Sequence, residues 1–336
     1  MSRVKKTALL TLAAATVAAG AAASVLYFYA TSELPIRNTP VQFSIASGSS
    51  LKGAARQLAG AGVVRHPMAL VLLGRILNRA GAIKAGSYEF EPGLTPYTLL
   101  QKITRGDVTL MAITFPEGST FRQWRRVLDQ HPKLKHQTTE WQETQILKVL
   151  SIDEKSAEGL FFPDTYHVSE GTSDLVVLRR AHKLMQRLLA DHWPSRASGL
   201  PVTTPYEALI LASIVEKETG RIEDRPMVAA VFVNRLRKGM LLQADPTVIY
   251  GLGESFDGNL RRRDLDEDTP YNTYTRTGLP PTPIAMPGLA SLVAVLNPPD
   301  SDVLYFVSRG DGTSHFSRTL PEHDRAVTKY QRSRKR

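Results

Sequence analysis

The stretch ALILASIVEKETG, residues 208–220, carries the clearest structural signal in this chain of 336 residues. Thr204 just before it is a good N-cap, Pro205 suits a first helical position, and Glu207 completes the pattern of a capping box. Gly220 is a natural helix stop. The sequence therefore predicts one continuous helix with well-marked ends.

Two glutamates, Glu216 and Glu218, lie in the last turn of this helix. At about 100° per residue, Leu211, Ile214 and Val215 share one apolar face. Glu218 falls in the middle of that face, and Glu216 falls almost opposite. Burial on an apolar face raises the pKa of a carboxyl group, as a general acid requires near neutral pH. These residues alone leave Glu218 as either a general acid or a solvated end residue, and they predict a solvated or salt-bridged Glu216.

Composition narrows the chemistry that is open to the chain. It has no cysteine, which excludes disulfides, thiolate metal sites and a cysteine nucleophile. Its net charge of +10 and pI of about 9.7 favour anionic partners such as lipid headgroups or an acidic polymer. The sequence shows neither zinc-finger spacing nor an RNA-recognition motif, so nucleic acid is not an expected partner.

The N-terminus predicts a membrane anchor. Three basic residues lie within residues 1–6, and an uncharged apolar run follows over residues 7–30, ending in the aromatic triplet YFY. The positive-inside rule makes residues 1–6 a cytoplasmic tail and 7–30 a single transmembrane helix. Everything after about residue 34 then lies outside the cytoplasm. The alternative is a cleaved signal peptide with a small-residue site at 21–23.

The remainder reads as an α+β protein in several parts. We expect a linker at 31–40, a small α+β module at 41–110, a larger mixed α/β domain at 111–330 and a basic tail at 331–336. The module should contain strands at 41–45, 85–90 and 108–115 and helices at 51–58, 67–79 and 95–103. The larger domain should contain helices at 119–128, 139–150, 174–192, 205–219 and 226–236, an irregular segment at 158–168, a mostly loop region at 251–290 and a strand at 303–308.

Four segments combine polar and aromatic residues with turn formers: the helix that ends in Glu218, EGLFFPDTY (158–166), LLQADPTVIYG (241–251) and TPYNTYTRTGLPPTPIAMPG (269–288). Aromatic and hydroxyl groups on proline-stiffened loops suit binding of sugars. Several of these residues are better explained structurally. Core packing is expected for Phe161, Phe162 and Tyr250, a turn role for Asp164, and capping of a short helix for Asp245.

Together, these segments resemble the endolytic murein transglycosylase (MltG, YceG-like) family. The signatures ASIVEKET, LQADPTVIYG, YNTYTRTGLPP and EGLFFPDTY occur in that family's order. The resemblance implies that Glu218 is the catalytic residue, that residues 41–110 form a LysM-like module and that residues 111–330 form the transglycosylase catalytic domain. It also implies that the anchor lies in the cell inner membrane and the catalytic domain in the periplasm. Gly220, after EKET, departs slightly from the family pattern.

The resemblance implies a lytic transglycosylase that cuts the MurNAc–GlcNAc β-1,4 bond of nascent glycan strands and leaves 1,6-anhydro-MurNAc ends. A hydrolase normally needs two carboxylates, whereas a single glutamate stands out here. The residues expected to bind glycan are Gln243, Asp245, Thr247, Tyr271, Asn272 and Tyr274. No metal or organic cofactor is implied, because the histidines lack ligand spacing, and a core or surface role is expected for His315.

The expected partners are peptidoglycan strands, the membrane and, as candidates, peptidoglycan synthases. A second hypothesis is a non-catalytic peptidoglycan-binding scaffold of the synthesis machinery; an intact Glu218 favours the enzyme. A third, a pyridoxal-phosphate-dependent aminodeoxychorismate lyase, is disfavoured by the N-terminal anchor.

Overall fold

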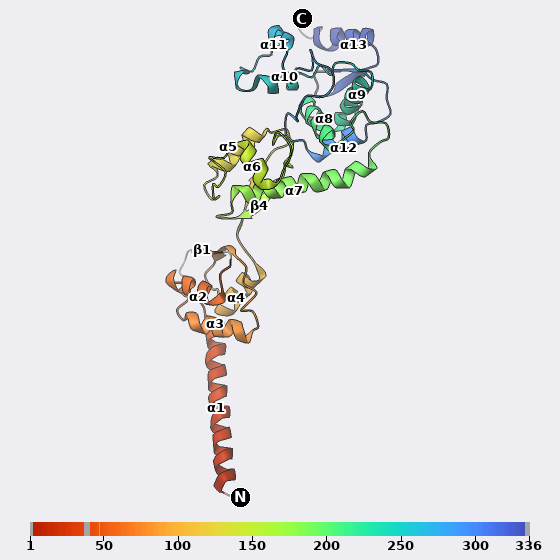
Figure 1. Cartoon of the computed structure of the whole chain (residues 1–336). Helices are drawn as coiled ribbons and strands as arrows, with labels where there is room; N and C mark the ends of the chain where they lie inside the picture. The colour runs from red at the N-terminus through yellow and green to blue at the C-terminus, as the bar shows by residue number, and fades with distance from the viewer. Residues whose placement is uncertain (1–2, 37–40, 47, 333–336) are drawn as a thin grey trace. The chain divides into compact units, whose positions relative to one another are not determined.

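The computed structural model describes residues 3–36, 41–46 and 48–332 of the chain (Figure 1). The chain divides into two units, Met1–Ala112 with His167–Gly171, and Ile113–Tyr166 with Thr172–Arg336. Each unit combines helices with short strands, which confirms the expected α+β class.

The N-terminal helix α1 (Arg3–Thr31) is continuous. Its portion Leu10–Thr31 carries no charged residue and has a mean hydropathy of 1.7; among the described helices, it alone is long and apolar enough to cross a membrane. Its hydroxyl groups bond within the helix, as Thr16 Oγ1 donates to Leu12 O and Ser24 Oγ to Gly20 O, both at 2.9 Å. Such internal bonding is what an apolar surrounding demands of polar groups.

The first unit contains β1 (Val41–Ile45), α2 (Leu51–Gly60), α3 (Pro67–Ile76), β2 (Gly86–Phe90) and α4 (Pro96–Arg105). β1 pairs antiparallel with β2, with Val41 opposite Phe90. Thr95 forms a capping box at the start of α4, and Gly106, at φ 77°, ends that helix in the left-handed conformation. The fully buried core includes Leu58, Leu70, Tyr88, Phe90, Leu99 and Ile103.

The start of the expected linker is packed against this unit. Leu34 and Ile36 are buried in its core together with Ala30, and Leu34 N donates to Leu94 O at 2.8 Å. Residues 37–40 lie outside the described residues. The described part of the segment after α1 is therefore held by the module and is not a free tether.

β3 (Leu110–Thr114) pairs with β4 (Thr165–Ser169) in a two-stranded sheet, of which residues 113–114 and 165–166 belong to the second unit. With it come α5 (Phe121–Gln130), α6 (Glu143–Leu150) and α7 (Asp174–His192). The indole of Trp124 stacks on Phe115 at 3.7 Å between ring centroids and lies 6.0 Å from Phe161. Phe161 is fully buried, so the expected core role is confirmed.

The remainder of the second unit is organised by three helices that contact one another: α8 (Pro205–Glu218), α9 (Arg225–Arg237) and α12 (Leu289–Leu296) (Figure 1). Around them lie α10 (Asp245–Leu252), α11 (Arg262–Asp266), β5 (Tyr305–Ser308), β6 (Ser314–Ser317) and α13 (Leu320–Val327). Three short 3₁₀ helices are η1 (Trp193–Ser195), η2 (Ile222–Asp224) and η3 (Gly253–Ser255), and η4 (Thr328–Arg332) is a short π-helix. β5 and β6 form an antiparallel hairpin with Tyr305 opposite Ser317.

Several predicted boundaries need correction. α3 ends at Ile76, because Leu77 already leaves the helical conformation. The segment 158–168 was expected to be irregular, yet β4 begins at Thr165 and pairs with β3. The region 251–290 is mostly loop, as expected, although it also contains η3 and α11. Residues 333–336 of the expected basic tail lie outside the described residues.

Candidate active site

The helix α8 forms for the reasons that its sequence suggests. Thr204 Oγ1 accepts a hydrogen bond from Glu207 N at 3.1 Å, and Glu207 Oε2 accepts one from Thr204 N at 3.3 Å. The expected single apolar face is wrong, however, because all residues from Ala208 to Glu216 are buried. Neighbouring helices α9 and α12 contact α8, and Ile284 N donates to Ser213 Oγ at 3.0 Å.

Glu216 is buried and fully engaged. Its Oε1 accepts from Arg225 Nη2 at 2.8 Å, and both side chains are less than a tenth exposed. Its Oε2 accepts from Gly288 N at 3.0 Å and from Ser291 Oγ at 2.7 Å. Of the two alternatives expected for Glu216, the salt bridge is confirmed. The side chain ties α8 to the start of α9 and to α12, which is a structural role.

Glu218, two residues later, has contrasting surroundings. It is half-buried, and no hydrogen bond or ion pair joins its carboxyl group to the described residues. Burial raises its pKa to about 8, with a further upward contribution from the charge of Asp245 and a downward one from Arg235. A carboxyl group with this pKa is largely protonated at neutral pH and can both give and take a proton.

Asp245 and Tyr274 meet beside Glu218. The Tyr274 hydroxyl donates a short hydrogen bond to Asp245 Oδ1, and its own pKa is raised by burial and by this carboxylate. The predicted capping role of Asp245 is wrong: Ala244 is the N-cap of α10, and Asp245 is the first helical residue. The Asp245 carboxylate is engaged by Tyr274 instead. Its charge thus lies within electrostatic reach of Glu218.

Gln243 is exposed and sits in the left-handed backbone region, at φ 52°. Its N–H donates to Thr273 O at 3.0 Å, and its Oε1 accepts from Arg235 Nη1 at 3.3 Å. Few residues with a side chain adopt this conformation, which costs conformational energy. The surrounding bonds therefore hold Gln243 in place in the segment that leads to Asp245.

Two of the expected binding residues are fully buried, Thr247 and Asn272. Thr247 Oγ1 donates to Ala244 O at 2.7 Å and shares a hydrogen bond with Thr273 Oγ1 at 2.8 Å. The Asn272 amide donates to Leu265 O at 3.0 Å and Glu267 O at 2.6 Å, and its Oδ1 accepts from Tyr274 N at 2.8 Å. Both residues fix the loops that carry exposed site residues.

Tyr271, the residue before Asn272, is half-buried. Its ring packs edge-on against Tyr250 at 4.9 Å, and its hydroxyl shares a hydrogen bond with Thr282 Oγ1 at 2.9 Å. Tyr250 in turn donates to Glu158 Oε2 at 3.2 Å. This chain of contacts joins three of the four segments that the sequence singled out.

Two functional candidates escaped the sequence analysis. Glu158 is buried, accepts from Phe121 N at 2.9 Å, and has a pKa raised to about 8 by burial. Arg235 is buried, and its charge acts on Glu218. Its Nε donates to Leu304 O at 2.7 Å, and its guanidinium lies 5.2 Å from the Tyr305 ring centroid. For Arg235 the sequence held a usable signal, because this arginine lies in the mostly apolar helical stretch PMVAAVFVNRL.

The remaining candidates lie elsewhere. Asp164 is exposed and accepts from Thr165 N at 2.7 Å, as a turn residue does. The His315 ring lies on β6, 5.6 Å from the Tyr330 ring. Asp129, His136 and Asp174 offer possible metal ligands, but both Asp174 oxygens already accept protein hydrogen bonds, including Leu175 N and Thr138 N. These hydrogen bonds tie Asp174 to the segment at Thr138 and to the start of α7.

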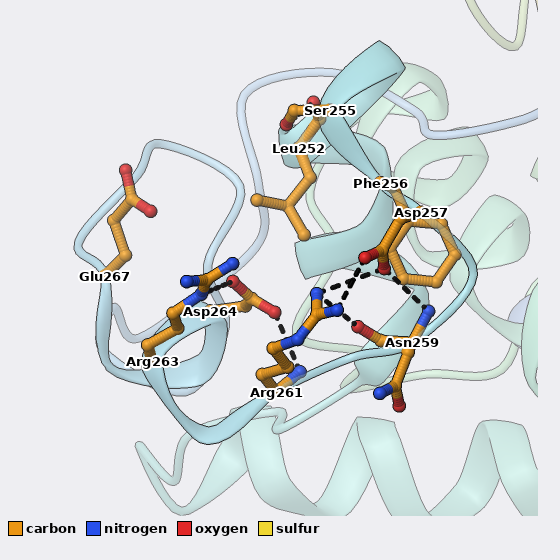
Figure 2. Close-up of a pocket in the computed structure, with 9 residues that line it drawn as sticks. All are labelled: Leu252, Ser255, Phe256, Asp257, Asn259, Arg261, Arg263, Asp264 and Glu267. Carbon is orange, nitrogen blue, oxygen red and sulfur yellow. Dashed lines mark hydrogen bonds and ion pairs between the residues drawn. The ribbon is translucent and has the colours of Figure 1, made fainter.

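A cavity of about 280 Å³ lies on the α10–α11 segment (Figure 2). Arg261 bonds Asp257 in it through both terminal nitrogens, at 3.1 and 2.5 Å, and Arg263 pairs with Asp264 at 3.4 Å. Glu218 is not among its lining residues. The arginines of this cavity are already paired with its aspartates, which does not indicate an acid–base centre.

Comparisons with known proteins agree on one family. The model of the YceG-like family matches residues 43–329. An endolytic murein transglycosylase of Bacillus subtilis (strain 168) is 32% identical over 309 residues, which cover 87% of this chain and 85% of the relative. One of Streptococcus pneumoniae (serotype 2, strain D39) is 28% identical over 328 residues, covering 88% of this chain but only 59% of the relative. A crystal structure of a YceG-like protein from Listeria monocytogenes aligns with a TM-score of 0.54 and 31% identity, over 85% of this chain and 98% of that one.

Proposed function

The chain belongs to the YceG-like family and is a lytic transglycosylase, a lyase, and we propose that Glu218 is its catalytic acid and base. The substrate that we propose is the glycan strand of peptidoglycan, cut internally at the MurNAc–GlcNAc β-1,4 bond. The observation that carries the proposal is the Glu218 carboxyl group: half-buried, free of hydrogen bonds to the described residues, with a pKa of about 8.

In the first step, protonated Glu218 donates to the glycosidic oxygen as its bond to C1 of MurNAc breaks. The carboxylate that remains is negatively charged beside Arg235, whose cation favours that form. The C6 hydroxyl of the same sugar then attacks C1 and gives its proton to Glu218. One C–O bond breaks, one forms, and no water is consumed, so the acid is restored and a 1,6-anhydro end results.

The transition state carries positive charge on the sugar ring. The Asp245 carboxylate, held by Tyr274, can stabilise that charge while it keeps Glu218 protonated. We propose that Gln243, Tyr271 and Tyr274 contact the glycan, because each is partly or fully exposed. Since Thr247 and Asn272 are fully buried, we propose that they act on the substrate by positioning these loops.

We also propose that α1 anchors the enzyme as a single span of the inner membrane, with its N-terminus in the cytoplasm. The uncharged length of Leu10–Thr31 supports a span, and the basic residues ahead of it support this orientation. The burial of Ala30 and Leu34 in the module supports retention of α1, because cleavage at 21–23 would leave the module with only the end of that helix. The LysM-like character of the module and its binding of glycan belong to the same proposal, as do peptidoglycan synthases as partners.

The test compares the full chain with Glu218→Gln on purified uncrosslinked glycan strands, with products identified by mass spectrometry. Glu140→Gln, an exposed glutamate of the same unit, is the matched control. Internal fragments with 1,6-anhydro ends from wild type and control, and none from Glu218→Gln, are the expected result. Reducing ends would indicate a hydrolase instead. Binding of strands without cleavage by any of the three proteins would favour the non-catalytic scaffold.

A further inference from the structure

The helix α3 (Pro67–Ile76) has one face in the core of the first unit and another in solvent. Leu70, Val71 and Leu73 are buried. Met68, Leu72 and Ile76 are large apolar residues that are 61%, 51% and 62% exposed. Residues spaced by four lie along one side of a helix, so the three form a continuous stripe. An exposed apolar stripe of this kind marks an interaction surface.

The stripe lies on the helix that meets the end of α1. The Tyr29 hydroxyl donates to the carbonyl of His66, the N-cap of α3, at 3.1 Å. Ala30 and Leu34 are buried in the same core as Leu70, so the module is fastened directly to α1. Figure 1 shows α3 at the end of the module where α1 emerges, and the two helices are in contact.

The chain segment that contains α3 is positively charged. Residues 61–86 contain four basic residues and no acidic one, and Arg65 and Arg75 are exposed next to the stripe. Tyr27 and Phe28, near the end of α1, are exposed as well, as aromatic residues of a membrane interface are. Apolar side chains flanked by arginines fit the surface of a lipid bilayer, where the apolar groups can contact acyl chains and the arginines can bind anionic phosphates of the headgroups.

We propose that α3 lies on the outer surface of the membrane that α1 crosses, with Met68, Leu72 and Ile76 inserted among the lipids. The partner is therefore a phospholipid bilayer that contains anionic headgroups. The proposal rests on the proposed anchoring by α1. It adds a second contact with the membrane, which holds the first unit against the bilayer instead of letting it pivot at a single point.

The absence of cysteine from the chain permits a direct test with single cysteines. Leu72→Cys in the full chain is labelled with an environment-sensitive fluorophore and inserted into nanodiscs of phosphatidylethanolamine and phosphatidylglycerol. Val17→Cys, in the middle of α1, reports the anchor, and Gln42→Cys, exposed on β1, reports water. Quenching by nitroxide-bearing lipids is compared with quenching by aqueous iodide.

The expected result is lipid quenching and blue-shifted emission at positions 17 and 72, with iodide quenching at position 42. Lipid quenching at 17 with iodide quenching at 72 would overturn the inference and leave the anchor intact. A label at 72 that neither quencher reaches would mean that protein covers the stripe, which also overturns it. Iodide quenching at both 17 and 72 would overturn the anchor together with the inference.

Discussion

Tyr274 donates a hydrogen bond to the Asp245 carboxylate, and through it the loop before α12 controls a charge that acts on Glu218. The two residues lie 29 positions apart in sequence, Tyr274 in a loop and Asp245 at the start of α10. The electrostatics of the proposed acid thus depend on a contact between this loop and the first residue of α10. Changes at this contact are expected to alter the pH profile as well as the rate.

The first prediction concerns Asp245→Asn. Because the Asp245 charge raises the pKa of Glu218, its removal lowers that pKa below about 8. The wild-type kcat/KM should fall as pH rises through about 8, and in the variant this alkaline fall should begin at lower pH. The measurement is kcat/KM against pH on glycan strands. Asp300→Asn, at an exposed site, is the control, and an alkaline limb that stays in place in Asp245→Asn would contradict the assignment.

The second prediction concerns the buried pair of Arg225 and Glu216. Removing one partner leaves an uncompensated buried charge, so Arg225→Met should lower the free energy of unfolding by about 3–5 kcal/mol. Arg122→Met breaks the exposed pair with Glu254 and should cost only about 0–1 kcal/mol. Urea unfolding of both variants measures the difference. Equal losses would show that the buried pair does not organise the helices.

The third prediction concerns Glu158, whose folded-state pKa is raised to about 8 from the usual 4.5. Between these values the folded state binds more protons than the unfolded state, so stability falls as pH rises. Glu158→Gln removes the contribution of this carboxyl group to the pH dependence of stability. The free energy of unfolding of the variant should therefore depend less on pH between about 5 and 8 than that of the wild type. Urea unfolding at the two pH values is the measurement. The same slope in both proteins would mean that Glu158 is not protonated in the folded chain.

The fourth prediction separates backbone strain from side-chain function at Gln243. Its φ of 52° is unfavourable for a residue with a Cβ atom, so Gln243→Gly should be more stable than Gln243→Ala by about 1 kcal/mol. Both variants lose the amide that we propose to contact glycan, and both should show a lower kcat/KM. Unfolding and turnover are measured for the pair. Full activity in the glycine variant would remove Gln243 from the substrate-binding residues.

Sequence signals that depend on near neighbours predicted the structure well. The helix α7 (Asp174–His192) has the bounds that its apolar periodicity indicated, and the Thr204 capping box starts α8 as expected. Strand β1 follows the alternation of Val41–Ile45. Each of these signals involves residues within one or two turns of one another, and such signals are visible in a single sequence.

Features that depend on residues far away in the sequence could not be predicted from local patterns. Periodicity predicted one buried face for α8, yet α9, α12 and the segment at Ile284 surround it, and this neighbourhood is what encloses Glu216. The burial of Glu158 depends on Phe121 and Tyr250, 37 and 92 positions away. The raised pKa of Glu218 was anticipated, but its actual neighbours, Asp245 and Arg235, became evident only from the fold.

The burial of Ala30 and Leu34 in the first unit has a consequence for membranes of different thickness. The uncharged part of α1, 22 residues long, is about 33 Å in length, slightly more than a hydrocarbon core of about 30 Å. A helix of this length tilts more in a thin bilayer and stands more upright in a thick one. With α1 as the proposed anchor, the module shares one core with that helix and must tilt with it, so lipid composition would act on the orientation of the first unit.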